Sequence, residues 1–215
     1  ALFSDLIFDR ISQLLNLIEA GAPWPKGTVK ARASFLEKDL EKRGEPSAQR
    51  VLLMLPALSR RYAGARLTTL QPWVRLWSHE ASFAGAQPKG AEDAWAELTI
   101  DIEYCNLMGI DYAGGTADIW KFFDQICRIL LYIIARIAGM PSGVLNAYSQ
   151  FQEGLTVYNT IAGGVGKAYK RRTGIPQGDP LSMTLVALIM RPWVTIILSI
   201  EGVKPMILVD DILIT

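Results

Sequence analysis

The chain has 215 residues, half of them hydrophobic and a fifth charged, which is a globular composition and excludes a chain disordered throughout. Its net charge of +1 provides no overall attraction to a polyanion. Two cysteines and one histidine are too few for a structural zinc site, and His79 lies near no nucleophile motif that would complete a catalytic triad.

Hydrophobic spacing and turn residues predict helices in the N-terminal half, joined by loops and one short strand. In chain order we expect a helix over 1–20, a loop over 21–27, a strand over 33–36, a turn over 38–47, a helical stretch over 50–77 with a break near Gln71-Pro72, a loop over 83–90 and a helix over 91–109.

The C-terminal half is predicted to place hairpins between helices. We expect a short strand over 116–119, a buried helix over 122–138, strands over 155–160 and 167–175 around a glycine-rich turn, a helix over 181–190, and strands over 206–209 and 212–214. Because helices and antiparallel hairpins interleave, the expected class is α+β.

Residues 183–200 are apolar enough to suggest a membrane span, but Arg191 and Pro192 lie at the centre of this stretch. A central arginine is costly in lipid, and proline interrupts a helix. We therefore expect a buried helix that ends near Arg191, and no membrane partner.

Basic residues are concentrated in two places. Residues 30–75 hold ten Lys and Arg against four Asp and Glu, and a second cluster follows at 167–172. Such clusters can contact the phosphates of a nucleic acid. A solvated helix face is the alternative for each of them.

The pair Asp210-Asp211 lies between two apolar runs, where carboxylates are costly unless something satisfies them. An exposed turn is one explanation, since Asp is a common turn residue. Binding of a hard cation by paired carboxylates is the other.

Two further segments carry candidate chemistry. Asp118 lies at the edge of a short apolar segment in TADIWKFFD, where it could also be the N-cap of the following helix. The stretch GIPQGDPLSM, residues 174–183, forms a rigid loop that enters a helix and offers free backbone N–H groups. A purely structural turn is the alternative there.

Taken in order, DIWKFFD, GIPQGDPLS and VDD resemble three sequence blocks of the reverse-transcriptase palm. The likeness is greatest to the branch of non-LTR retrotransposons and group II introns, whose fingers blocks and glycine-rich block resemble FLEKDL, QRVLLMLPAL and FAGAQPKGAEDAW. The resemblance implies a right-hand polymerase with a ferredoxin-like palm sheet and no thumb. Residues 1–95 would hold an N-terminal helix and fingers, and 96–215 the palm, with a fingers insertion around 139–175.

The resemblance also implies a reaction and its residues. Two Mg²⁺ ions, for which Mn²⁺ could substitute, would be held by Asp118 and Asp210 with support from Asp211. By the same resemblance Lys38 and Arg50 hold the incoming triphosphate, Phe123 lies under the nucleotide sugar and excludes a 2′-hydroxyl, and Gln177 and Gly178 line the nucleotide pocket. Asp179 receives no role.

The implied partners are an RNA template, a DNA primer and deoxynucleoside triphosphates in an intracellular setting that includes the nucleus, with the oligomeric state left open. Leu208-Val209 replaces the usual aromatic-Ala before the acidic pair, and the chain stops shortly after it. We therefore expect residues 1–215 alone to bind nucleic acid weakly and to extend no primer. An RNA-dependent RNA polymerase palm and an inactive truncated retroelement remnant remain alternatives.

Overall fold

The computed structural model describes residues 5–37, 45, 49–161 and 163–215. The chain divides into two compact units. The first takes Ala1–Thr68 and Ile126–Pro180, and the second takes Thr69–Gln125 and Leu181–Thr215. Both units combine helices with a β-sheet, as expected for the α+β class. The predicted boundary between fingers and palm at residue 95 stays a prediction.

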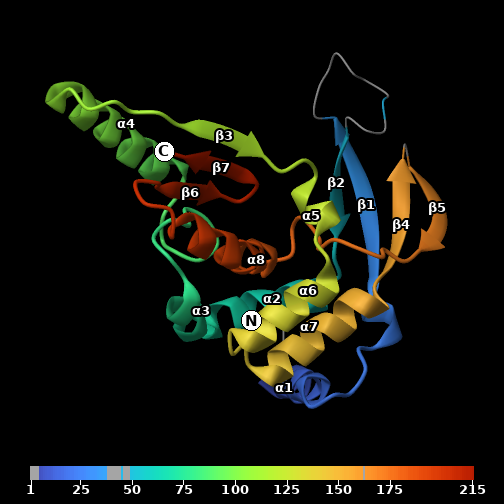
Figure 1. The fold of residues 1–215 in the computed structure, drawn as a ribbon. Helices are drawn as coiled ribbons and strands as arrows, with labels where there is room; N and C mark the ends of the chain where they lie inside the picture. Colours follow the sequence, from blue (N-terminus) through green and yellow to red (C-terminus); the bar gives the residue numbers. More distant parts are fainter. Residues whose placement is uncertain (1–4, 38–44, 46–48, 162) are drawn as a thin grey trace. The chain divides into compact units, whose positions relative to one another are not determined.

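The first unit contains a four-stranded sheet in the order β2-β1-β4-β5, visible side by side in Figure 1. The strands are β1 (Lys30–Glu37), β2 (Gln49–Met54), β4 (Thr156–Ile161) and β5 (Gly164–Tyr169). The pair β1–β4 is parallel, whereas β1–β2 and β4–β5 are antiparallel. The glycine-rich hairpin is confirmed, but its second strand ends at Tyr169 instead of continuing to Ile175.

Helices complete the first unit: α1 (Asp5–Glu19), η1 (Lys26–Thr28), α2 (Ala57–Thr69), α6 (Arg128–Ile137) and α7 (Ser142–Gly154). Along β1, Ala31 and Ala33 are buried and Arg32 is exposed, the period-2 pattern of a strand with one covered face. The two alanines join a core that includes Trp24, whose indole N–H donates to the Ala147 carbonyl at 2.9 Å.

Residues 49–54 form a strand, so the predicted helical stretch over 50–77 is wrong at its start. The short apolar run suits either structure. Pairing with β1 decides it, because Leu53 becomes buried opposite Ala33. Helix follows only after Pro56, and the expected break falls between α2 and α3 (Gln71–Trp77).

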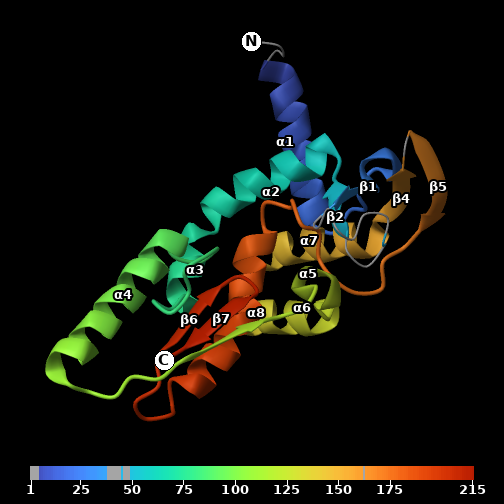
Figure 2. The same cartoon turned by 90° about the horizontal axis from the view of Figure 1, so that it is seen from above.

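The second unit contains a three-stranded antiparallel sheet in the order β3-β7-β6. Its strands are β3 (Gly115–Asp118), β6 (Pro205–Leu208) and β7 (Asp211–Ile214), and its helices are α3, α4 (Ala91–Met108), α5 (Phe122–Gln125) and α8 (Ser182–Ile197). Figure 2 shows the sheet lying against α8. Met190 and Val194 of α8 share a buried cluster with Ile207, against which Ile212 packs.

The loop that precedes α4 needs glycine at residue 85. Gly85 has a φ of +76°, and a Cβ atom there would lie 2.2 Å from the backbone oxygen of Met183. The Gly85 carbonyl accepts a hydrogen bond from the Thr184 hydroxyl at 2.7 Å. The loop expected over 83–90 is thus fixed to the start of α8 by a close backbone approach that any larger residue would disrupt.

The helix expected to end near Arg191 continues through Pro192 to Ile197. Proline removes one backbone hydrogen bond, but Val194 beyond it is fully buried, and this burial favours continuing the helix. The Arg191 side chain also donates to the Trp77 carbonyl at 2.9 Å. Among the helices of the described residues, none is both long and apolar enough to cross a membrane.

The single buried helix predicted over 122–138 is two helices, α5 and α6, separated at Ile126 and Cys127. Cys127 has the extended backbone of an N-cap, and the Ile126 carbonyl accepts from the Gly174 N–H at 2.7 Å. A contact with a residue far along the chain therefore replaces the helical hydrogen bond. Ile129 and Ile137 of α6 are also exposed, not buried as expected.

Candidate functional site

Asp118 and Asp211 lie directly opposite each other on neighbouring strands of the second unit. The Ile119 N–H donates to the Asp210 carbonyl at 3.0 Å, which makes Asp118 and Asp211 a non-hydrogen-bonded pair of the antiparallel ladder. The Cα atoms of such a pair are about 4.5 Å apart and their side chains project from the same face. Two carboxylates from separate sequence blocks therefore meet on one surface.

This surface is the face of the sheet that α8 does not cover. Ile212 packs on the α8 side, so its neighbour Asp211 projects to the opposite side. Asp118 and Asp211 are exposed, and within the described part of the chain neither carboxylate has a hydrogen bond or an ion pair. Like charges directly opposite each other destabilise a sheet, so the pair has a cost that a bound cation would offset.

A groove of about 400 Å³ borders the two carboxylates. Its walls are α4, through Trp95 and Leu98, and the strands, through Met206 and Leu208. The acids therefore lie at the edge of a mostly apolar space that is large enough for part of a ligand.

Asp210 is the second residue of the two-residue turn that joins β6 to β7. The first turn residue, Val209, has a φ of +66°. With φ positive at the first position alone, the turn is of the II′ kind, which normally has glycine there. A β-branched residue in this conformation is strained, and the strain lies beside the acidic pair.

We expect Val209→Gly to raise the free energy of unfolding by about 1 kcal/mol, because relief of the strain exceeds the extra entropy of an unfolded glycine. Chemical denaturation measures this change. The matched control is Val203→Gly, since Val203 is also half-buried but has an ordinary φ. The control should lose stability, and a similar loss in Val209→Gly would contradict the strain.

The arrangement suits Mg²⁺ by its chemistry, because carboxylate oxygens are the ligands that this ion prefers. Among the described residues, no group of three or more His, Cys, Asp or Glu is placed to hold a metal ion. The pair Asp118 and Asp211 nevertheless fits, since Mg²⁺ commonly binds one or two carboxylates together with substrate phosphates. Metal binding by Asp118, Asp210 and Asp211 stays a prediction.

Phe122 and Phe123 of α5 have different surroundings. Phe122 packs against the buried cluster of the second unit, whereas Phe123 is half-buried outside that cluster. Their ring centroids are 6.5 Å apart in an edge arrangement. Phe122 is therefore a structural ring, and Phe123 stays available for the predicted contact with a sugar.

The other predicted nucleotide contacts lie in the first unit. Arg50 is exposed on β2, opposite Leu36 of β1. Gln177 is half-buried and Gly178 is exposed. Gly178 has a φ of +113°, a backbone conformation in which any other residue would be strained. Lys38 lies outside the described residues.

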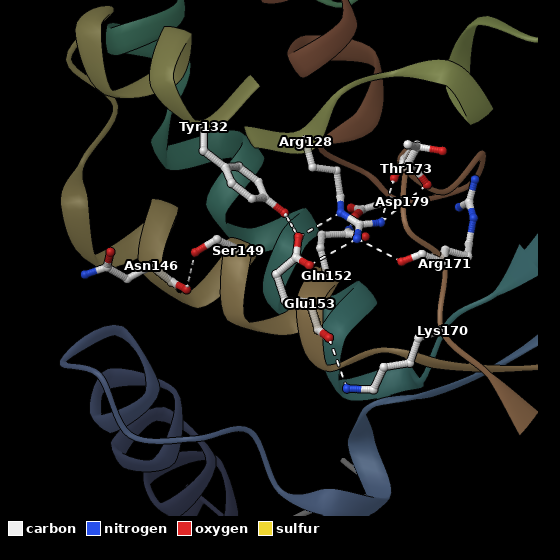
Figure 3. Close-up of polar contacts among 11 residues, drawn as sticks. Arg128, Tyr132, Asn146, Ser149, Gln152, Glu153, Lys170, Arg171, Thr173 and Asp179 are labelled. Atoms are coloured by element: carbon white, nitrogen blue, oxygen red, sulfur yellow. Dashed lines mark hydrogen bonds and ion pairs between the residues drawn. The ribbon is translucent and has the colours of Figure 1, made fainter. Parts of the chain in front are cut away.

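A polar network in the first unit holds the loop that carries Gln177 and Gly178 (Figure 3). The buried Arg128 guanidinium donates to both carboxylate oxygens of Glu153, at 2.8 and 3.0 Å. It also donates to the carbonyls of Arg171 at 2.9 Å and of Thr173 at 3.4 Å. Sequence reasoning missed this network, although an arginine inside a predicted buried helix is a signal because it must find a partner.

The charge state of Glu153 depends on this network. Partial burial opposes ionisation, but the hydrogen bonds from Arg128 and Tyr132 outweigh it and hold the pKa of Glu153 below its ordinary value. The ion pair thus contributes stability above the unfolded pKa of a glutamate, and this contribution is lost as the pH falls through the lowered pKa.

No protein-family profile and no curated protein sequence matches the chain. Among solved structures, it is similar to apo telomerase from Candida tropicalis, with a TM-score of 0.56 and 15% sequence identity. The match covers 99% of this chain and 43% of the telomerase chain, so this chain spans less than half of that protein. At this identity the similarity concerns the fold alone, and the chain has a fold like that of this telomerase.

Proposed function

We propose that the chain is the fingers and palm of an RNA-directed DNA polymerase of the retrotransposon and group II intron kind. The observation that carries the proposal is that Asp118 and Asp211 lie opposite each other on one face of the β3-β7-β6 sheet, beside Asp210. Neither carboxylate has an ion pair with another described residue. The pair joins two of the three sequence blocks by which the chain resembles this family. The telomerase-like fold supports a polymerase fold of this general kind, while the choice of branch rests on the sequence blocks alone.

The reaction would be nucleotidyl transfer. The primer 3′-hydroxyl attacks the α-phosphate of a deoxynucleoside triphosphate, a new oxygen–phosphorus bond forms, and pyrophosphate leaves. Asp118, Asp210 and Asp211 are the residues that would hold two Mg²⁺ ions, or Mn²⁺. Bound there, the ions would stabilise the attacking and leaving oxygens. A lysine or arginine bound to these carboxylates would compete with the metal ions. Among the described residues, none forms an ion pair with them.

The remaining residues would bind and select the nucleotide. Lys38 and Arg50 supply positive charge beside the triphosphate. This charge would stabilise the negative charge that develops on the phosphate oxygens during transfer. Gln177 and Gly178 line the nucleotide pocket. Phe123 lies under the sugar, where an aromatic ring leaves no room for a 2′-hydroxyl and thereby favours deoxynucleotides. The template would be RNA and the primer DNA.

The test is primer extension by the complete protein on primed RNA with Mg²⁺ and deoxynucleotides. Extension that Asp210→Ala abolishes would support the proposal. Two results would sink it: extension that is unaffected by Asp210→Ala, or a complete protein that extends primers only with ribonucleotides. The second result would favour an RNA-dependent RNA polymerase. Nucleic-acid binding without extension would favour an inactive remnant.

A further inference from the structure

We infer that Arg128, Gln152 and Glu153, named here the loop clamp, are positioning residues that fix loop 171–179 for nucleotide binding. The inference rests on the proposed function in one respect, because Gln177 and Gly178 of this loop are its predicted nucleotide contacts. The contacts by which the clamp holds the loop do not depend on the proposed function. They can be tested without an activity assay.

The clamp holds the first part of the loop by its backbone. Arg128, at 5% relative exposure, donates to the carbonyls of Arg171, Thr173 and Gly174 at 2.9, 3.4 and 3.4 Å. The remaining donors of the same guanidinium hold both oxygens of Glu153. Only a planar fork with several N–H donors can serve a carboxylate and a set of carbonyls together, so lysine cannot replace it.

The clamp also holds the end of the loop. Asp179, at 5% relative exposure, accepts a hydrogen bond from the Gln152 amide at 3.2 Å. Gln152 and Glu153 are neighbours near the end of α7, and Arg128 is the first residue of α6. Both ends of the loop are therefore tied to one pair of packed helices (Figure 3).

Between these two fixed ends, Ile175 is fully buried and anchors the middle of the loop. Only Gln177 and Gly178 then stand outside the anchored positions, half-buried and exposed respectively. A short segment that is held on both sides has few conformations left, so its two free residues are pre-organised for a ligand. The arrangement places the predicted nucleotide contacts on a rigid support.

The same unit contains a matched control, a second group of this kind whose contacts to a shared glutamate join two helices. Tyr62 and Arg66 of α2 both donate to Glu19 of α1, just as Tyr132 and Arg128 donate to Glu153. This second Tyr-Glu-Arg group joins two helices. If an Arg–Glu pair matters only for general stability, weakening either group should have the same consequences.

The first measurement is limited trypsin digestion of the folded chain, with mass spectrometry of the bonds after Lys170, Arg171 and Arg172. Arg128→Lys and Glu153→Gln should be cut there about tenfold faster than the wild type, because the loop opens locally at lower free energy. Arg66→Lys and Glu19→Gln should be cut at the wild-type rate. Equal rates in the clamp variants and in their controls would overturn the inference.

The second measurement is the binding of a fluorescent deoxynucleoside triphosphate in the presence of Mg²⁺, which needs no turnover. Arg128→Lys and Glu153→Gln should weaken Kd about tenfold, corresponding to loss of pre-organisation. The control variants should bind normally. Faster cutting with unchanged Kd would overturn the positioning role and leave the proposed function standing. A wild-type chain that binds no nucleotide would count against the proposed function, while the digestion still decides whether the clamp holds the loop.

Discussion

Asp118→Asn is expected to abolish primer extension by the complete protein and, at the same time, to stabilise the protein slightly in the absence of metal. Removing a ligand of a catalytic metal withdraws several kcal/mol of transition-state stabilisation, which corresponds to a loss of about a thousandfold or more in rate. The gain in stability has a different origin. It comes from removing one of two like charges on opposing residues of β3 and β7.

In EDTA, Asp118→Asn should raise the free energy of unfolding by about 0.5 kcal/mol, since exposed charge pairs on a sheet contribute only fractions of a kcal/mol. Asp211→Asn should behave alike. Addition of Mg²⁺ should raise the Tm of the wild type and leave both variants unchanged, because binding to the folded state alone stabilises it. Thermal melts with and without Mg²⁺ measure this.

Asp111→Asn is the matched control, because Asp111 is an exposed acid of the same unit that lies before β3. It should retain both the response to Mg²⁺ and the extension activity. If Mg²⁺ stabilises Asp118→Asn as much as it stabilises the wild type, the carboxylate pair is not the metal site. If Mg²⁺ fails to raise the Tm of Asp111→Asn as well, the response reflects a general effect of charge and not a specific site.

The hairpin that carries Asp210-Asp211 could be predicted from the sequence, but the register of its strand β7 against β3 could not. Apolar strands on both sides of Asp210-Asp211 indicate a hairpin with acids at the tip, and that hairpin is confirmed. Which acid faces Asp118 depends on the pairing of β3 with β7, and a slip of one residue would turn every side chain to the other face. Sequence spacing contains no information on that pairing, so Asp211 emerged as the partner only in the folded chain.

The wrong predictions share a physical cause, which is that tertiary contacts override local preference. The apolar run of β2 becomes a strand because β1 offers it a partner. Helix α8 passes Pro192 because residues beyond it are buried. The predicted helix over 122–138 is interrupted where Ile126 bonds to Gly174, and a contact at that separation has no local signature.

The loop clamp illustrates the same limit for functional positions. Arg128 donates to the Glu153 carboxylate, 25 positions later in the chain, and to backbone carbonyls 43 to 46 positions later. Every residue possesses such a carbonyl. Motif reasoning proposes residues for contact with a ligand, such as Gln177, because their side chains occur in a distinctive block. It does not find the groups that hold them, because those are chosen by geometry.

Phe123→Val is expected to admit ribonucleotides in the complete protein while deoxynucleotide use changes little. The reason is steric, because the smaller side chain opens space where a 2′-hydroxyl would lie. A pocket that excludes one hydroxyl by shape discriminates by about a hundredfold, so the ratio of kcat/KM for dNTP over NTP should fall by about that factor. Single-nucleotide incorporation with each sugar measures the ratio.

Phe122→Val is the control that separates selectivity from structure. Phe122 packs against the cluster of Ala81, Met190, Val194 and Ile207, so its truncation should lower the free energy of unfolding by about 2 kcal/mol. Sugar discrimination should be unaffected, because that ring is committed to the core. Phe123→Val should show the opposite behaviour, with stability nearly unchanged, since its ring lies outside the cluster. Relaxed sugar selection in Phe122→Val, with none in Phe123→Val, would transfer the gate to Phe122 and refute the assignment made from the sequence.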